Sequence, residues 1–134
     1  MRHEQSIQQK SRAVRVLLVD DQSSMRQWLA LLLEEVGSIQ VVGEAANGRE
    51  GFELTRQLQP DVVLMDIHMP VLDGIRATRL IHAECPTVRV IGLSSMPGEG
   101  EQAAAMREAG AVSFLPKGIA ADVLVAAVRG RVES

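Results

Sequence analysis

The chain is poor in aromatic residues and in cysteine, and each shortage disfavours a class of protein. Its 134 residues include two Phe, one Trp and no Tyr. Base stacking on aromatic side chains, the usual means of holding single-stranded nucleic acid, therefore has little to use. A flavin-binding electron carrier is disfavoured for the same reason. The lone cysteine, Cys85, excludes an internal disulfide and fits a reducing compartment, so we expect a cytoplasmic location.

Neither charge nor hydropathy indicates nucleic acid or membrane binding. The formal net charge is −3, and Lys and Arg form no dense cluster of the kind that phosphate contacts require, so we expect no direct nucleic acid binding. No apolar stretch approaches the roughly twenty residues that span a bilayer. Residues 1–12 are mostly polar and do not resemble a signal peptide. We therefore expect no membrane association.

Length and hydrophobic content fit one domain with an aliphatic core. The chain is 46% hydrophobic, which is enough for a layered core. Residues 1–12 lack periodicity and are interpreted as a flexible lead-in or linker, which leaves a domain over residues 13–131. Short apolar runs alternate five times with helical patterns. The predicted strands are Val14–Val19, Ile39–Ala45, Val62–Met65, Val88–Leu93 and Ala111–Leu115, and the predicted helices are Ser23–Val36, Arg49–Leu58, Gly74–Glu84, Glu101–Ala109 and Ala120–Arg129.

This alternation predicts an α/β fold, a five-stranded parallel sheet with helices on both faces. Gln40 and Glu44 in the second strand, and Pro116 beside the fifth, indicate the two edges, because an edge tolerates polar side chains and missing donors. The predicted strand order is 2-1-3-4-5. Ser23 or Ser24 is expected to cap the first helix. Trp28 flanks the apolar stripe of this helix, and packing into the core is favoured over partial exposure to a partner.

Four of the apolar runs lead into residues suited to a phosphate or a divalent cation. Asp20 and Asp21 follow the first strand, Asp66 closes the third, Ser94 the fourth, and Lys117 follows the fifth. Parallel strands direct their carboxyl ends to one edge, where open α/β sheets bind ligands. The sequence therefore predicts one site that combines carboxylates, a hydroxyl and an ammonium.

The chemistry of this site follows from its charges. Crowded carboxylates repel one another and raise each other's pKa, so a cation is expected among them. Hard oxygen ligands favour Mg²⁺, which is often completed by a substrate phosphate. The alternative, that the acids only cap the first helix, is disfavoured because Asp66 lies on another strand. Asp66 is also a candidate nucleophile for a phosphoryl group, with Lys117 neutralising the phosphate and Ser94 donating to one of its oxygens.

These residues resemble the receiver domain of two-component response regulators. The resemblance extends from about Val14 to Val128 and rests on the Asp20-Asp21 pair, the segment DIHMPVLDG at Asp66–Gly74, the GLSS stretch containing Ser94, and Lys117. It implies a flavodoxin-like fold and phosphorylation of Asp66 by a partner histidine kinase or phosphotransfer protein. It also allows a homodimer of the phosphorylated form. Such a phosphoprotein catalyses only its own phosphorylation and dephosphorylation, as one step of a phosphorelay.

The resemblance also implies a metal site. In it, Asp21, Asp66 and the backbone carbonyl of His68 hold Mg²⁺, and Asp20 contributes through water. The His68 side chain has two interpretations, which the sequence leaves open. It is either an exposed loop residue or a group that overhangs the path of the attacking water.

A conformational switch is implied as well. In the family, a hydroxyl residue, here Ser94, moves towards the phosphoryl group, and an aromatic residue, here Phe114, rotates inwards behind it. Phe114 stands where many members have Tyr, so the switch would depend on packing. The order Pro116-Lys117-Gly118 also departs from the family, which commonly has Pro after the lysine, and it excludes a cis-proline bond at 117–118.

One alternative function and the question of the output remain at this point. A Mg²⁺-dependent phosphatase acting through an aspartyl phosphate at Asp66 is disfavoured, because such enzymes carry an acid where this chain has His68, and because no cap domain is present. The output is open, since similar receivers occur in helix-turn-helix regulators and in hybrid histidine kinases.

Overall fold

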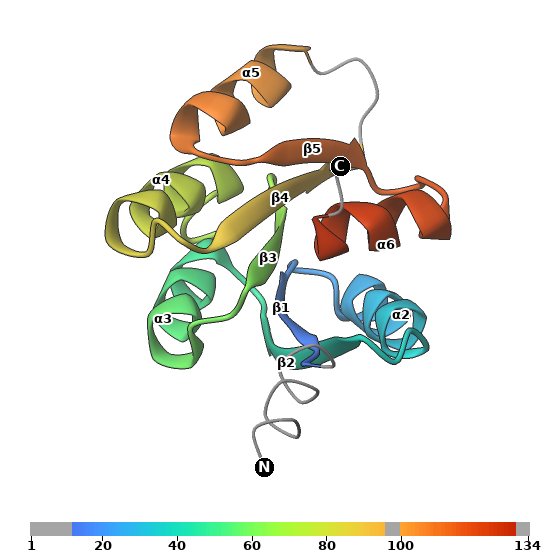
Figure 1. Cartoon of the computed structure of the whole chain (residues 1–134). Coiled ribbons are helices and arrows are strands. Elements are labelled where there is room, and N and C mark those ends of the chain that lie inside the picture. Colours follow the sequence, from blue (N-terminus) through green and yellow to red (C-terminus); the bar gives the residue numbers. More distant parts are fainter. Residues whose placement is uncertain (1–11, 96–99, 131–134) are drawn as a thin grey trace.

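Strands and helices alternate along the whole described chain. The computed structural model describes residues 12–95 and 100–130 (Figure 1). The elements are β1 Val14–Val19, α2 Ser23–Glu34, β2 Ile39–Ala45, α3 Gly48–Leu58, β3 Val62–Asp66, α4 Gly74–Glu84, β4 Arg89–Ser94, α5 Gly100–Ala109, β5 Ser113–Pro116 and α6 Ala121–Arg129. Nearly all of the predicted lead-in, and the predicted domain end at residue 131, lie outside the described residues, so those boundaries stay predictions.

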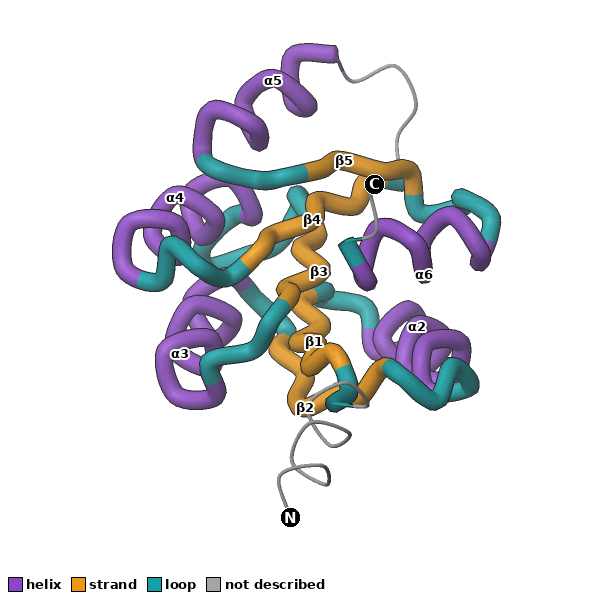
Figure 2. The backbone as a smooth tube through the Cα atoms, viewed as in Figure 1, coloured by secondary structure: helices purple, strands orange, loops and turns teal. Residues whose placement is uncertain are grey.

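The strands form one parallel sheet in the order β2-β1-β3-β4-β5 (Figure 2). This confirms the predicted fold class, the strand order and both edge strands. Helices α3, α4 and α5 lie on one side of the sheet, and α2 and α6 lie on the other (Figure 1). No helix among the described residues is both long and apolar enough to cross a bilayer.

Each face of the sheet has its own aliphatic core. Towards α3, α4 and α5 the strands present residues such as Val63 and Met65, which pack with Ile81. Towards α2 and α6 they present the alternate residues, such as Leu64, which packs with Leu33. Burying one side chain of this size contributes about 1.5–3 kcal/mol, so a core without many aromatic residues suffices to hold the layers together.

The register of the strands determines where the predicted site residues lie. The last paired residues are Val19 and Met65 between β1 and β3, Asp66 and Leu93 between β3 and β4, and Ser94 and Pro116 between β4 and β5. Four of the five strands, all except β2, therefore end at, or one residue before, a residue singled out in the sequence. The four residues at or just after the ends of β1, β3, β4 and β5 consequently lie side by side along one edge.

Two predictions about α2 were wrong. The residue at its N-cap is Gln22, whose side chain makes no capping hydrogen bond, so neither Ser23 nor Ser24 caps the helix. The Gln22 N–H donates instead to Asp20 Oδ1 at 2.9 Å, so the acidic residue supports the start of the helix. Trp28 is 45% exposed, because it precedes the buried position Leu29 by one residue and so lies beside the buried stripe of the helix.

The loop between β3 and α4 contains a strained residue. Val71 has φ = 72°, in the left-handed region, and it is one of two residues other than glycine with positive φ among those described. A β-branched side chain is a genuine outlier in this region. The Val71 side chain is also 77% exposed, so it gains little from packing. The contacts of the Val71 side chain therefore offset little of the backbone strain.

We expect Val71→Gly to stabilise the domain. Glycine relieves a strain of about 1–2 kcal/mol, and its greater freedom in the unfolded chain offsets about half of that, so the free energy of unfolding should rise by about 0.5–1 kcal/mol. Urea denaturation measures this change. The matched control is Val123→Gly, at a half-exposed position inside α6, which should destabilise. Loss of stability in both variants would contradict the strain at Val71.

Candidate functional site

Three carboxylates meet at the carboxyl edge of the sheet. One oxygen from each of Asp20, Asp21 and Asp66 lies within 4.8 Å of the others. Asp20 and Asp66 are only 2% and 4% exposed, whereas Asp21 is exposed. The structure therefore brings together the acids that the sequence assigned to one site, two of them buried and one open to solvent.

Asp66 is held in place by the loop that follows it. The Gly74 N–H donates to the Ile67 carbonyl oxygen at 2.9 Å. A Cβ atom at position 74 would lie 2.1 Å from the Asp66 carbonyl oxygen, so only glycine permits this approach. The first residue of α4 therefore packs directly on the backbone of Asp66 and fixes the end of β3.

The Lys117 ammonium lies between the two buried acids. Its Nζ is 2.7 Å from Asp20 Oδ2 and 3.4 Å from Asp66 Oδ1, and the lysine side chain is only 8% exposed. Burial on its own would lower the pKa of Lys117, but the contacts with Asp20 and Asp66 outweigh it, so the pKa lies above its ordinary value. The Lys117 N–H also donates to the Ser94 carbonyl oxygen at 2.8 Å, which links β5 to β4.

The pKa of Asp66 is raised from 3.8 to about 6. Burial is the largest cause, followed by the charge of Asp20, while Lys117 opposes both. The raised pKa agrees in direction with the sequence-based expectation, but the expected cause, repulsion between carboxylates, ranks below burial. Asp66 therefore carries a carboxylate whose charge is poorly stabilised without a further cation.

This pKa predicts how stability depends on pH. Since the pKa of folded Asp66 exceeds its unfolded value, this group stabilises the fold fully below about pH 4 and loses that effect as pH rises through about 6. Between pH 5 and pH 7.5 in EDTA, Asp66 should remove about 1 kcal/mol of unfolding free energy.

Urea melts of wild type and Asp66→Asn at both pH values isolate this effect, because the variant cannot titrate at position 66. As pH rises from 5 to 7.5, the unfolding free energy of wild type should fall by about 1 kcal/mol relative to that of Asp66→Asn. Parallel pH profiles would contradict the raised pKa.

Ser94 lies at the end of β4, one residue beyond the register partner of Asp66, and Phe114 lies on the neighbouring strand β5. Ser94 is buried at the end of β4. The half-buried Phe114 pairs in register with Gly92. A Cβ atom at position 92 would lie 2.7 Å from the Phe114 ring and 2.6 Å from the terminal carbon of Met106. The ring therefore rests on the glycine backbone and against the core, two register steps before Ser94.

His68 is exposed, and its Nε2 lies 3.4 Å from Nε2 of Gln102 in α5. The first of its two interpretations, an exposed loop residue, fits this placement, and the contact adds a link between the loop and α5. All peptide bonds in the described part of the chain are trans, including the one that joins Lys117 to Gly118.

One contact at the site had no signal in the sequence. The Arg26 guanidinium, from the first turns of α2, donates to the backbone carbonyl oxygen of Asp20 and also pairs with Glu44 of β2. An arginine a few residues after an acidic pair is normally a solvated helix residue. Only the packing of α2 against β2 turns it towards the site.

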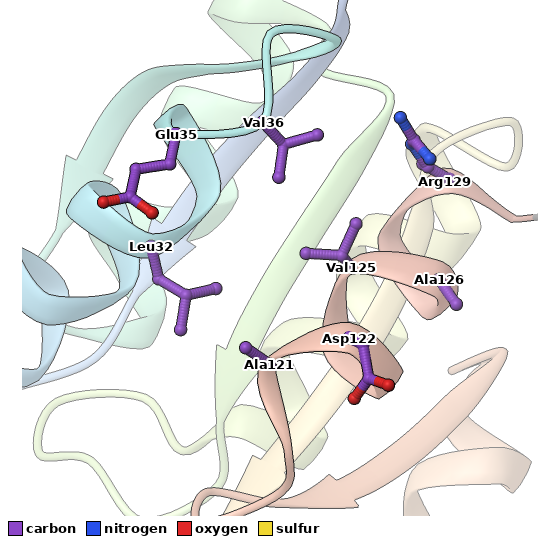
Figure 3. A pocket seen from close by; sticks show the side chains of 8 residues that line it. All are labelled: Leu32, Glu35, Val36, Ala121, Asp122, Val125, Ala126 and Arg129. Carbon is purple, nitrogen blue, oxygen red and sulfur yellow. The ribbon is translucent and has the colours of Figure 1, made fainter.

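A surface groove lies away from this site. It has a volume of about 570 Å³ and runs between α2 and α6. Figure 3 shows its lining, with apolar side chains such as Leu32 and Val125 facing one another and with Glu35, Asp122 and Arg129 around them. None of the predicted site residues lines it.

The acidic cluster fits a bound Mg²⁺. Asp20 Oδ2 is buried and accepts no hydrogen bond, and its contact with the Lys117 ammonium is an ion pair. This oxygen therefore has lone pairs that a metal ion could use. Three carboxylates in reach of one another provide hard oxygen ligands, and the exposed Asp21 leaves an open side for water and a phosphate. The arrangement can therefore place a cation next to the Asp66 carboxylate.

Comparison with known proteins matches residues 16–129 to the family described as Response regulator receiver domain. The chain is 44% identical over 114 residues to protein-glutamate methylesterase/protein-glutamine glutaminase 1 of Geobacter sulfurreducens, covering 84% of this chain and 31% of that protein. It is 40% identical over 115 residues to the transcriptional regulatory protein LnrK of Bacillus subtilis, covering 86% and 52%.

A solved structure shows the same fold. The response regulator domain of Thermotoga maritima CheB is similar with a TM-score of 0.83 and 38% identity, covering 92% of this chain and 100% of that one. The chain thus spans about a third to a half of the length of the two curated relatives.

Proposed function

This chain belongs to the response regulator receiver domain family, which matches residues 16–129, and on that premise we propose that it is a phosphorylation-activated signalling receiver. Asp66 is the phosphoacceptor. The observation that carries this assignment is the position of Asp66, at the end of a central strand, with both acidic residues in reach and Lys117 Nζ at 3.4 Å. A histidine kinase or phosphotransfer protein supplies the phosphoryl group.

The reaction is a displacement at phosphorus. An oxygen of the Asp66 carboxylate attacks the phosphorus of a phosphohistidine, and the P–N bond breaks. The imidazole nitrogen keeps the electron pair and takes up a proton, and an acyl phosphate forms on Asp66. Lys117, already within ion-pair distance of Asp66, neutralises a phosphoryl oxygen, and the Ser94 hydroxyl donates to another. Catalysis is thus limited to the chain's own phosphorylation and dephosphorylation.

Mg²⁺ supplies charge neutralisation between the attacking carboxylate and the phosphoryl group when it is bound. We assign its ligands to Asp21, Asp66 and the backbone carbonyl of His68, with Asp20 acting through water. The close grouping of the three carboxylates and the burial of two of them support this assignment. Asp21 is the exposed member of the three, so its carboxylate would remain open to solvent and to a phosphodonor.

The context of the domain follows from this chemistry. We propose that the chain acts in the cytoplasm, as one step of a two-component pathway. We propose that phosphorylation promotes a homodimer and that this segment does not contact nucleic acid itself. The relatives are named for methylesterase and transcriptional activities. If this domain is part of a longer protein, we propose that its phosphorylation controls the activity of the attached domain.

The assignment of Asp66 is tested by labelling. With Mg²⁺ and acetyl phosphate, wild type should gain one phosphoryl group, measured as a mass increase of the intact protein, and Asp66→Asn should gain none, because the amide cannot form the acyl phosphate. Asp122→Asn, at an exposed position in the first turn of α6, is the matched control and should label as wild type does. Labelling of Asp66→Asn to the wild-type extent would overturn the proposal.

The switch is tested through the aromatic ring of Phe114. The chain has only two phenylalanines, so a fluorophenylalanine-labelled protein gives one ¹⁹F signal for Phe114 and one for the reference residue Phe52. We expect a phosphoryl mimic, beryllofluoride with Mg²⁺, to shift the Phe114 signal in wild type. In Ser94→Ala the shift should be lost, while labelling at Asp66 is largely retained, because the hydroxyl links the phosphate to the ring.

Ser95→Ala, at an exposed neighbouring position, is the control and should behave as wild type. Equal Phe114 shifts in wild type and Ser94→Ala would exclude Ser94 as the link.

A further inference from the structure

Arg26 occupies a position in which its charge and its hydrogen bonds both act on the acidic cluster. We propose that Arg26 is the positioning residue of the metal site, which holds the Asp20-Asp21 segment in the geometry that binds Mg²⁺. This inference depends on the proposed function, since it concerns the same cluster. It assigns a role to a residue that touches neither Asp66 nor Lys117 in any described contact.

The Arg26 side chain is anchored at both ends of its guanidinium. One terminal nitrogen donates to the backbone carbonyl oxygen of Asp20, and Nε donates to Glu44 Oε1 at 2.8 Å. Only 16% of the Arg26 side chain is exposed, compared with 43% for Glu44. A partly buried, doubly bonded guanidinium is more rigid than a surface ion pair, because its planar fork fixes two partners at once. Arg26 therefore connects the chain after β1 to the edge strand β2.

The Asp20 residue is held by contacts to all its polar groups. Its N–H donates to the Ala45 carbonyl oxygen at 3.0 Å, and its Oδ1 accepts from the Gln22 N–H at 2.9 Å. Its Oδ2 lies against the Lys117 ammonium, and its carbonyl oxygen accepts from Arg26. Arg26 thus supplies the side-chain restraint on the peptide group that joins Asp20 to Asp21.

This restraint matters most for Asp21. The Asp21 carboxylate is exposed, and no hydrogen bond or ion pair holds it among the residues that the structure describes. Its direction is therefore determined by the backbone that carries it, and Arg26 bonds to the peptide group immediately before it. Partners that orient a metal ligand in this indirect way typically change metal affinity by 10- to 100-fold when they are lost.

The charge of Arg26 would act in the opposite direction. A cation beside the carboxylates repels an incoming Mg²⁺, so if charge alone mattered, removing it would tighten metal binding. If positioning dominates, removing it weakens binding. Arg26→Gln therefore separates the two effects by the sign of the change. Arg26→Lys keeps the charge but cannot reproduce the fork, and Glu44→Gln keeps the guanidinium but weakens its anchor.

The experiment is a Mg²⁺ titration of the metal-free domain, followed by calorimetry or by the amide NMR signals of residues 20–22. We expect Kd for Mg²⁺ to rise about 10-fold in Arg26→Gln and about 3- to 10-fold in Arg26→Lys and Glu44→Gln. The matched control is Arg49→Gln, which removes an arginine paired through Nε with Glu53 at 3.3 Å on the surface. Its Kd should equal that of wild type.

Two further readouts separate positioning from a general effect on folding. At saturating Mg²⁺, labelling of Arg26→Gln by acetyl phosphate should return to within about twofold of the wild-type rate, because Asp66 and Lys117 are intact. Urea melts in EDTA report the structural contribution. Lower stability with an unchanged Kd, or tighter Mg²⁺ binding in Arg26→Gln, would overturn the role of Arg26. A wild-type chain that binds no Mg²⁺ would instead overturn the proposed function.

Discussion

The buried contact between the Lys117 ammonium and the carboxylates of Asp20 and Asp66 is the interaction on which the edge of this sheet depends. Two carboxylates at 2% and 4% exposure would strongly destabilise the domain without a cation, and removing one partner of such a buried arrangement typically costs about 3–5 kcal/mol. Lys117 compensates them incompletely, since the pKa of Asp66 remains raised. The fold therefore tolerates a charge imbalance at this edge, which a metal ion would relieve.

Much of the fold could be predicted because its signals are local. Continuous apolar runs marked the central strands, and polar residues such as Gln40 and Glu44 marked an edge, which together sufficed for the strand order. The grouping of the acids was predictable for the same reason. Parallel register carries residues at strand ends to one edge, and Asp66 and Ser94 are the last residues of their strands.

The features that could not be predicted all depend on contacts through space. Trp28 and Leu29 are adjacent, and only the exact rotation of α2 on the sheet decides which is buried. The hydrogen bond from the Gln22 N–H to the Asp20 side chain, found where a capping serine was expected, depends on the path of the chain between β1 and the helix. The contact of Arg26 with Asp20 requires β2 to lie beside the loop. No pattern of spacing encodes these distances.

The glycine at position 92 has a consequence for how this domain could be altered. The Phe114 ring occupies the space into which a side chain at position 92 would project. The ring can pack this closely against β4 only because Gly92 has no side chain. Mutations that enlarge position 92 would act as a steric stop beneath the ring, without changing any group that handles phosphate. In the proposed switch, variation at this strand position would change the balance between two positions of the Phe114 ring and leave the proposed phosphorylation site unaltered.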